Sequence, residues 1–597
     1  MSNLLNGIKR GRTYLKKNGL KETLRRTRIF LSEKNPRKYK LWIRNCEKAS
    51  YKWELKSEPL ISVCMPVYNP EIRWLKRAVD SVLNQTYENF ELCIADDCST
   101  DPRVKKYLES LRDKRIKVIY RQKNGNISEA TNTAIEAAEG EFIALLDNDD
   151  ELARNAFAEI VKTLDKYPEA DVIYSDEDKI DKKGKRSEPF FKPDFSPQTL
   201  LSLNYISHLG VYRRELVNRL GGLRSEYDGS QDYDLALRAA DITDNIYHIP
   251  KVLYHWRILD TSTAGDIGKK SYAYDAAKRA VEDTIKRRGL RAEVKAVKNS
   301  SFYSVEFKPD NRDFVSIIIP VKDKPEITEN CLKSIYEKTN FKNYEVIIID
   351  NNSEEPETLA LFEKYRQKDN CKVLSLDMPF NYSRLNNIAA GLAGGNILLF
   401  LNNDTEVISE NWLGAIAGAC RETDIGCVGA KLLYPNDTIQ HCGIILGAGG
   451  LAGNCGTGVH KNERGYFGRY ALNYNCSAVT AACLGVRKSL FEKVGGFDES
   501  FAVAFNDVDF CLKVKALGVN NLCLGDVCLY HYESLTRGLE DSPEKMERFK
   551  GEIRRFKDKW GEELLLNDPC YSVNMSLGLD NLFKPLTEPG ARRLAEP

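Results

Sequence analysis

The chain has 597 residues, of which 42% are apolar and 29% are charged, and 88 basic against 86 acidic residues leave a net charge of +2. This composition excludes a mostly disordered chain, and the balance of charges excludes a protein built mainly to coat nucleic acid. The length predicts more than one domain.

A basic arm opens the chain. The first 45 residues carry a net charge of +12, and the remainder carries −10. Apolar residues recur among these cations at helical spacing, so we expect a basic helical N-terminal arm over residues 1–57. A peripheral contact of residues 1–45 with an anionic membrane surface is one interpretation. The alternative is a helical arm that packs on the first domain or on a partner subunit.

The sequence favours a cytoplasmic location. No apolar run approaches the roughly 20 residues that a transmembrane helix needs. Basic residues such as Lys9, Arg10 and Lys16 interrupt any apolar core of a signal peptide. Sixteen cysteines are scattered without a Cys-x-x-Cys pair, which favours free thiols in a reducing compartment.

Short motifs recur in the same order in two parts of the chain, which predicts a tandem duplication. The matches are 62–67 with 316–321, 96–99 with 350–353, 146–149 with 401–404, 221–222 with 495–496, 231–234 with 506–509, and 254–255 with 530–531. The offset rises from 254 to 276, so the second copy has about 20 extra residues. The Gly-rich segment 443–469 is the expected place for them, as a loop near the active face.

Strand-like and helix-like patterns alternate within each copy. In the first copy, β-rich runs over 60–67, 91–95, 117–120 and 142–146 alternate with helical patterns over 72–84 and 128–138. This alternation predicts an α/β domain with a mostly parallel sheet and helices on both faces. We expect domains over 58–300 and 314–565, a linker over 301–313 and a C-terminal tail over 566–597.

An acidic motif follows an apolar strand in both copies. In Asp147-Asn148-Asp149, two carboxylates at a strand end suit a divalent cation with a diphosphate on its far side. A turn or a helix N-cap is the alternative for a single motif. Because the motif recurs as Asn402-Asn403-Asp404, we favour the cation and assign it to the shared Asp149 and Asp404.

Two further pairs occupy matching positions. Asp232 and Asp507 precede amphipathic helices, where a carboxylate can act as a general base or simply cap the helix. His255 and His531 follow apolar runs, where imidazole can bind metal or phosphate or have no role. Recurrence favours the functional interpretation of each pair.

Polar residues also end an earlier strand of each copy, at Asp96-Asp97 and Asp350-Asn351. A carboxylate there can accept a hydrogen bond from the N–H of a uracil or thymine ring, and an amide oxygen can do the same. A strand-to-helix cap is the alternative.

Together these motifs resemble the inverting nucleotide-sugar glycosyltransferases of family two, which have the GT-A fold. The first half carries Met65-Pro66-Val67-Tyr68-Asn69, Asp96-Asp97-Cys98-Ser99, Asp147-Asn148-Asp149-Asp150, Gly229-Ser230-Gln231-Asp232-Tyr233-Asp234 and Tyr254-His255-Trp256-Arg257. The second half carries Asn402-Asn403-Asp404-Thr405-Glu406, Gly495-Gly496-Phe497-Asp498-Glu499, Phe505-Asn506-Asp507-Val508-Asp509 and a run over residues 531–538. This second set is similar to rhamnosyltransferase-like members that build bacterial surface polysaccharides. The resemblance covers about residues 60–290 and 314–560.

The resemblance implies a role for each candidate residue. Asp232 and Asp507 would be catalytic bases, and Asp149 and Asp404 would bind Mg²⁺ or Mn²⁺, with His255 and His531 close to the metal and the diphosphate. The residues implied in donor binding are Pro66, Tyr68, Asp96, Asp97, Asp147, Arg257, Pro320, Asp350, Asn351, Asn403 and Arg537.

The resemblance also implies the reaction. We expect a bifunctional glycosyltransferase that moves sugars from UDP- or dTDP-sugars, rhamnose among the candidates, to a growing lipid-linked surface glycan at the inner face of the cytoplasmic membrane. Asn351 and Asn402 stand where the first half has Asp97 and Asp147, so the second half departs from the pattern. Two alternatives stay open: one catalytic half with a glycan-binding or scaffold partner, and a tandem nucleotidyltransferase. The lack of a Gly-rich loop over residues 65–70 argues against the second alternative.

Overall fold

The computed structural model describes residues 36–47, 54–259, 267–297, 302–533 and 542–588, together with 592 and 594. Residues 1–35 of the expected arm and the expected donor-binding Arg537 lie outside these ranges. Within these ranges, we find no helix with the length and apolarity needed to cross a membrane.

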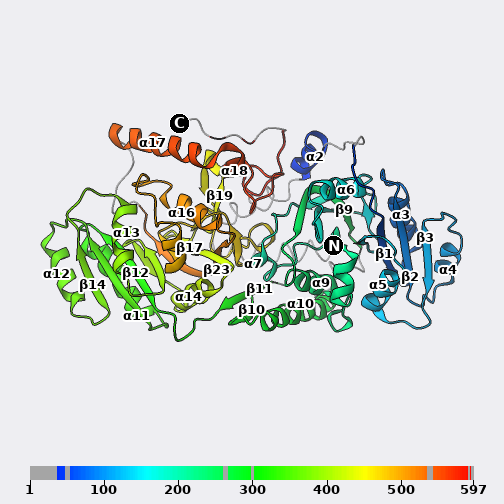
Figure 1. The fold of residues 1–597 in the computed structure, drawn as a ribbon, viewed down its shortest axis with the longest axis horizontal. Helices are drawn as coiled ribbons and strands as arrows, with labels where there is room; N and C mark the ends of the chain where they lie inside the picture. The colour runs from blue at the N-terminus through cyan, green and yellow to red at the C-terminus, as the bar shows by residue number, and fades with distance from the viewer. Residues whose placement is uncertain are drawn as a thin grey trace, which may run out of the picture.

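Two α/β domains lie side by side and together give an elongated molecule (Figure 1). The strands of the first sheet are β1 (Ile61–Val67), β2 (Phe90–Asp96), β3 (Ile116–Tyr120), β4 (Phe142–Leu145), β5 (Glu151–Leu152), β6 (Val172–Ile180), β7 (Arg186–Phe190), β8 (Gly210–Arg213) and β9 (Ile246–Arg257). The helices of this domain are α3 (Ile72–Leu83), α4 (Pro102–Leu108), α5 (Asn126–Glu136), α6 (Ala156–Lys166), α7 (Pro197–Leu200), α8 (Arg214–Leu220), α9 (Gln231–Ala239) and α10 (Ile267–Arg287).

The second domain repeats this pattern. Its main strands are β12 (Val315–Val321), β13 (Tyr344–Asp350), β14 (Cys371–Ser375), β15 (Ile397–Leu401), β16 (Thr405–Val407), β17 (Ile425–Leu433), β22 (Cys483–Arg487) and β23 (Asn520–His531). Between β17 and β22 lie β18 (Ile439–His441), β19 (Ile444–Leu446), β20 (Ala452–Asn454) and β21 (Tyr474–Cys476). The helices are α11 (Pro325–Lys338), α12 (Pro356–Arg366), α13 (Tyr382–Leu392), α14 (Trp412–Arg421), α15 (Lys488–Lys493), α16 (Asn506–Lys515), α17 (Pro543–Trp560) and α18 (Glu562–Leu566).

The two sheets have the same strand order. The first runs β3-β2-β1-β4-β8-β6-β9-β5 and the second runs β14-β13-β12-β15-β22-β17-β23-β16. The central strands β1 and β13 are mostly apolar and are buried along their whole length, as helices on both faces of a parallel sheet require. This shared order confirms the predicted duplication.

The register of the last strands corrects one match between the halves. Glu151 pairs with His255, whereas Thr405, which corresponds to Asp150, pairs with His531. His531 therefore corresponds to Trp256, and the prediction that His255 matches His531 is wrong by one residue. Neighbouring strand residues face opposite sides of a sheet, so this shift turns His255 away from the side that His531 faces.

Several segments join the domains, among them α7, where Gln198 Nε2 donates to Asp424 Oδ2 at 2.6 Å. β10 (Ala292–Ala296) and β11 (Tyr303–Phe307) form an antiparallel pair, so a strand lies inside the expected linker 301–313. The segment 443–469, expected as a loop, contains the antiparallel pair β19–β20 and contributes Phe467, whose ring stacks on Phe190 of the first domain at 3.5 Å between centroids. The C-terminal segment crosses back to the first domain, where Asn574 Nδ2 donates to Asp176 Oδ2 at 2.9 Å (Figure 1).

Helix α2 (Pro36–Asn45) docks on this assembly. Tyr39 and Trp42 are buried, and Tyr39 donates to Asp178 Oδ2 at 2.6 Å. Asn45 Nδ2 donates to the carbonyl of Thr587 at 2.8 Å. The packing alternative for the arm therefore holds for its described part.

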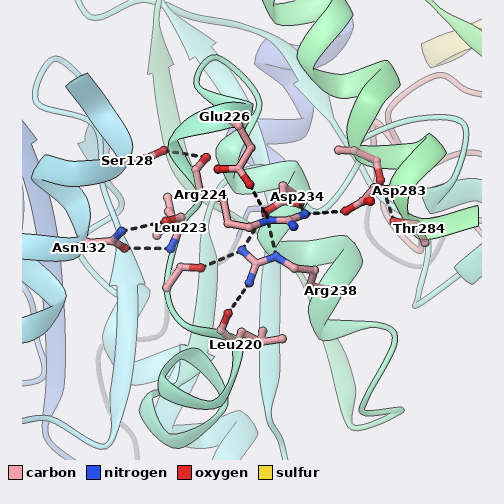
Figure 2. Close-up of polar contacts among 12 residues, drawn as sticks. Ser128, Asn132, Leu220, Leu223, Arg224, Glu226, Asp234, Arg238, Asp283 and Thr284 are labelled. Carbon is pink, nitrogen blue, oxygen red and sulfur yellow. Dashed lines mark hydrogen bonds and ion pairs between the residues drawn. The ribbon is translucent and has the colours of Figure 1, made fainter. Parts of the chain in front are cut away.

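Helix α9, which carries Asp232, is fixed by a buried carboxylate at Asp234 (Figure 2). Asp234 Oδ2 accepts from Arg238 Nε at 2.9 Å and from Arg224 Nε at 3.1 Å. Arg238 also donates to the carbonyl of Leu220, and Arg224 donates to Asp283 at 3.0 Å. This network ties the start of α9 to α8 and α10.

Replacement of Asp234 by alanine should lower the free energy of unfolding by about 3 kcal/mol, because two partly buried arginines lose their shared carboxylate. Chemical denaturation followed by far-UV circular dichroism measures the change. Glu226, 64% exposed and 3.9 Å from Arg224, is the matched control. Glu226→Ala should change the stability by no more than about 0.5 kcal/mol; equal losses in both variants would contradict the role of Asp234.

Candidate active site

A cavity of about 930 Å³ opens at the carboxyl ends of β1 and β4 in the first domain. The structure brings five of the expected site residues into its lining: Pro66, Tyr68, Asp97, Asp147 and Asp232. They come from three strand ends and from the first turn of α9. A parallel sheet gathers its carboxyl ends at one edge, which explains why residues far apart in sequence meet here.

Three carboxylates crowd the end of β4. Asp150 is buried and accepts from the Tyr254 hydroxyl and from the Arg257 backbone N–H, both at 2.6 Å. Burial, together with the neighbouring charge of Asp147, raises the pKa of Asp149 to about 6. The cavity walls also raise the pKa of Asp147 by desolvation, and Asp232 adds to this effect. Asp149, expected to bind the metal, is not among the described residues that line the cavity, and within the described ranges no group of three or more His, Cys, Asp or Glu side chains is placed to hold a metal ion.

The residues expected to bind the nucleoside lie at one side of the cavity. The Asp97 carboxylate accepts from the Gly125 backbone N–H at 2.9 Å and pairs with Arg121 Nε at 2.9 Å. Tyr68 keeps 50% of its surface exposed at the rim, so one ring face is open for stacking. Asp96 is buried at the end of β2 and is not among the described residues that line the cavity.

Asp232 projects from the first turn of α9 into the same cavity. Its Oδ2 accepts from Asn204 Nδ2 at 2.9 Å, which fixes the carboxylate in place. A carboxylate aimed into a cavity opposite an acidic motif has the placement that a general base needs.

His255 and Arg257 lie behind the acidic motif and not in the cavity. His255 Nδ1 is 2.6 Å from Asp178 Oδ1, in the network that also holds Tyr39 of α2. Arg257 is buried, stacks on Trp74 at 4.3 Å and donates from Nε to the carbonyl of Asp149 at 2.7 Å. The Arg257 side chain thus supports the acidic loop, and neither His255 nor Arg257 is among the described residues of the cavity lining.

His208, which the sequence did not indicate, does line the cavity. Its Nε2 is 3.9 Å from Asp147 Oδ2, and its ring stacks on Tyr254 at 4.5 Å between centroids. Burial alone lowers the pKa of this imidazole, but the hydrogen bond and charge of Glu177 raise it to about 9. No repeated motif marks His208, because the matching position of the second half is Ala482.

The second domain places its acidic motif against His531. His531 Nε2 is 3.1 Å from Asp404 Oδ1 and 3.3 Å from Asn402 Nδ2, and Nδ1 is 2.6 Å from Gln440 Oε1. If Nδ1 carries the proton for Gln440, the Nε2 lone pair faces the Asp404 carboxylate. The 3.1 Å contact is within hydrogen-bond distance if Nε2 carries the proton instead, and the pair lies in no described group of three or more His, Cys, Asp or Glu side chains that could hold a metal ion.

The other expected residues of the second domain have protein partners. Asp507 Oδ2 accepts from the Ala481 backbone N–H at 3.2 Å, and burial raises the pKa of Asp507. Asn351 Nδ2 donates to the carbonyl of Met378 at 2.8 Å, and Asp350 Oδ1 accepts from the Ser353 N–H at 2.9 Å. Asn403 Nδ2 donates to Thr328 Oγ1 at 3.0 Å, and Pro320 lies next to Ile349 of β13.

A family model for glycosyl transferase family 2 matches residues 62–221 and 316–495, one match in each domain. The chain is 42% identical over 88% of its length to an uncharacterized protein of Sinorhizobium fredii, of which it covers 58%. It is 37% identical over 82% of its length to an O-antigen biosynthesis protein of Myxococcus xanthus, of which it covers 38%. The chain thus spans less than two thirds of each of these relatives.

Solved structures are more distant. The chain resembles TarS of Staphylococcus aureus in complex with UDP-GlcNAc, at 21% identity and a TM-score of 0.32 over 38% of this chain and 66% of that one. It also resembles a mannosyltransferase of Pyrobaculum calidifontis in complex with GDP-Man and Mn²⁺, at 14% identity and a TM-score of 0.32 over 49% of this chain and 73% of that one.

The family match falls on the strands whose carboxyl ends carry both acidic motifs. The two halves share one strand order and one arrangement of acidic motif and helix-borne carboxylate. These findings confirm the two tandem GT-A domains: the chain belongs to glycosyl transferase family 2.

Proposed function

We propose that the protein is a bifunctional inverting glycosyltransferase of surface-polysaccharide assembly, with one site in each domain. The observation that carries the proposal is the cavity of about 930 Å³, in which Asp232 faces the acidic motif of β4. The similarity to an O-antigen biosynthesis protein supports the polysaccharide role. We propose UDP- or dTDP-sugars as donors and a lipid-linked glycan as the acceptor.

The residues of the first site suit a single displacement. Asp232 accepts the proton of the acceptor hydroxyl, which frees that oxygen to attack the anomeric carbon. Tyr68 and Asp97 hold the nucleoside, so that the sugar lies between the base and the acidic motif. Asp147 and Asp149 hold a divalent cation, Mg²⁺ or Mn²⁺, which when bound neutralises the leaving diphosphate. One displacement inverts the anomeric centre.

In the second site, Asp507 is the proposed base and Asp404 with His531 the proposed cation ligands. Burial around Asp507 raises its pKa, which strengthens it as a proton acceptor. Asn402 replaces one carboxylate of the first site, so this site carries less negative charge beside the diphosphate. We infer that the two sites take different donors.

Each of the two bases should serve a different sugar transfer. Asp232→Asn should abolish one transfer and Asp507→Asn the other, each by a factor of about 10² to 10⁴, since the proton acceptor is lost. Mass spectrometry of products from a panel of UDP- and dTDP-sugars measures this. Asp558→Asn, on the exposed face of α17, is the control. If either base variant leaves both transfers intact, the chain does not have two independent sites.

Removal of metal should stop both transfers. With EDTA present, the protein should make neither product, and added Mn²⁺ should restore both. Asp149→Ala should stop only the transfer that Asp232 serves, because the acidic motif at a strand end contributes little packing. Product analysis with and without chelator is the measurement. Undiminished transfer in EDTA would exclude the cation from the mechanism.

We propose that residues 1–35 contact an anionic membrane surface. Helix α2, which follows them, already packs on the first domain and on the C-terminal segment. Deleting residues 1–35 should weaken binding to vesicles of phosphatidylglycerol and remove its dependence on salt. Vesicle sedimentation measures both. Transfer to a soluble acceptor should be unchanged, which controls for folding. Equal vesicle binding by the full-length and shortened chains would mean that residues 1–35 pack on the protein or on a partner subunit instead of on a membrane.

A further inference from the structure

In the second domain, helix α17 holds the turn that precedes the proposed base. The helix follows β23 in the chain and lies against the start of α16 (Figure 1). Its Glu552 is only 2% exposed. The two carboxylate oxygens of Glu552 accept from the backbone N–H groups of Val503 and Ala504, at 3.0 and 3.2 Å. A buried carboxylate on α17 thus binds two consecutive backbone donors of the turn 503–505.

The last residue of this turn, Phe505, has a backbone conformation that needs support. Its φ of +61° lies in the left-handed region, which costs a residue other than glycine about 1–3 kcal/mol. The Phe505 ring stacks on Phe549 and Phe556 of α17, with 5.8 and 5.1 Å between centroids. The Phe505 carbonyl accepts from the Asp509 N–H at 2.8 Å, which is the first hydrogen bond of α16. Helix α17 therefore fixes the residue from which α16 begins.

The carboxylate of Asp507 depends on this start, because Asp507 lies two residues after Phe505 in the first turn of α16. Asp507 Oδ2 accepts from the Ala481 N–H at 3.2 Å. The carbonyl of the next residue, Ala482, accepts from the Asn402 N–H at 3.1 Å. The base and the acidic motif thus contact neighbouring residues of one segment, so a movement of the start of α16 changes the distance between them.

The first domain holds the corresponding turn with other groups. Helix α10 follows β9 as α17 follows β23. Ser230 Oγ donates to the carbonyl of Ala273 in α10 at 2.8 Å. Gly229, at φ +90°, lies against the Tyr272 ring of α10, with which a Cβ at this position would collide. A hydroxyl and a glycine therefore have the role in the first domain that Glu552 and stacked rings have in the second.

We propose that Glu552 is a positioning residue of the second site: through the N–H groups of Val503 and Ala504 it fixes the start of α16 and aims the Asp507 carboxylate at the acceptor hydroxyl. This inference rests on the proposed function for the role of Asp507 as the base. Glu552 acts through the turn and not on the substrate. Because a displacement of about 1 Å in a reactive group can lower a rate about 10²-fold, its loss should affect the chemical step more than donor binding.

Glu552→Gln in the full-length chain tests this inference. The variant is nearly isosteric, but its amide N–H would face one of the two backbone N–H donors. The kcat of the transfer that Asp507→Asn abolishes should fall at least tenfold, while the KM for its donor should change less than twofold. The transfer that Asp232 serves should be unchanged, which shows that the chain is folded. Initial rates with mass spectrometry of the products measure both transfers.

Two further variants make the test specific. Glu552→Asp keeps the charge but is too short to hold both N–H groups, so it should give the same loss and replaces Glu552→Gln if that variant does not fold. Glu547→Gln, on the exposed face of α17, is the matched control and should change both transfers less than twofold. An unchanged kcat in both Glu552 variants, or an equal fall in both transfers, would overturn the inference.

Asp507→Asn, measured beside these variants, separates this inference from the proposed function. If Asp507→Asn abolishes a transfer whose kcat Glu552→Gln leaves unchanged, only the positioning role of Glu552 is refuted. If Asp507→Asn leaves both transfers intact, the proposed base is wrong and the inference about Glu552 is wrong with it.

Discussion

Negative charge at the end of β4 is the constraint on which the first domain depends. Asp147, Asp149 and Asp150 follow one another within four residues; Asp150 is buried, and Asp147 and Asp149 are partly buried. Unpaired charges in such a place are costly. The Tyr254 hydroxyl and the Arg257 backbone hold Asp150, the Arg257 guanidinium holds the loop, and His208 faces Asp147.

The second domain has less negative charge at the corresponding strand end. Its motif is Asn402-Asn403-Asp404-Thr405, with one carboxylate where the first domain has three. Correspondingly, Tyr532 stands at the position of Arg257 and Ala482 at the position of His208. His531 faces the remaining carboxylate. The two sites therefore differ in charge at several corresponding positions, which fits our proposal that they take different donors.

The sequence predicted the fold well, because the repeat supplied each pattern twice. The alternation of strands and helices and the repeated motifs singled out Asp97, Asp147 and Asp232 as site residues. All three line one cavity in the structure. The histidines show where sequence matching fails. Tyr254-His255 resembles Tyr530-His531 in letters, but a strand has a period of two, so a shift of one residue reverses the face.

Other features needed three-dimensional contacts. His208 has no counterpart in the second half and stands in no motif, so only its position across the cavity from Asp147 reveals it. Glu177, which accepts from the His208 backbone N–H at 3.0 Å, pairs with the buried Lys192 at 3.1 Å within the first domain. The expected loop 443–469 could be located from the drift in offset, but its packing on Phe190 depends on how the two domains meet.

The most direct test of two sites on one chain is a crystal structure of the full-length protein soaked with Mn²⁺ and UDP, with anomalous scattering used to locate the metal. The account predicts two anomalous peaks per chain, one within bonding distance of Asp149 and one within bonding distance of Asp404. A single peak would contradict it.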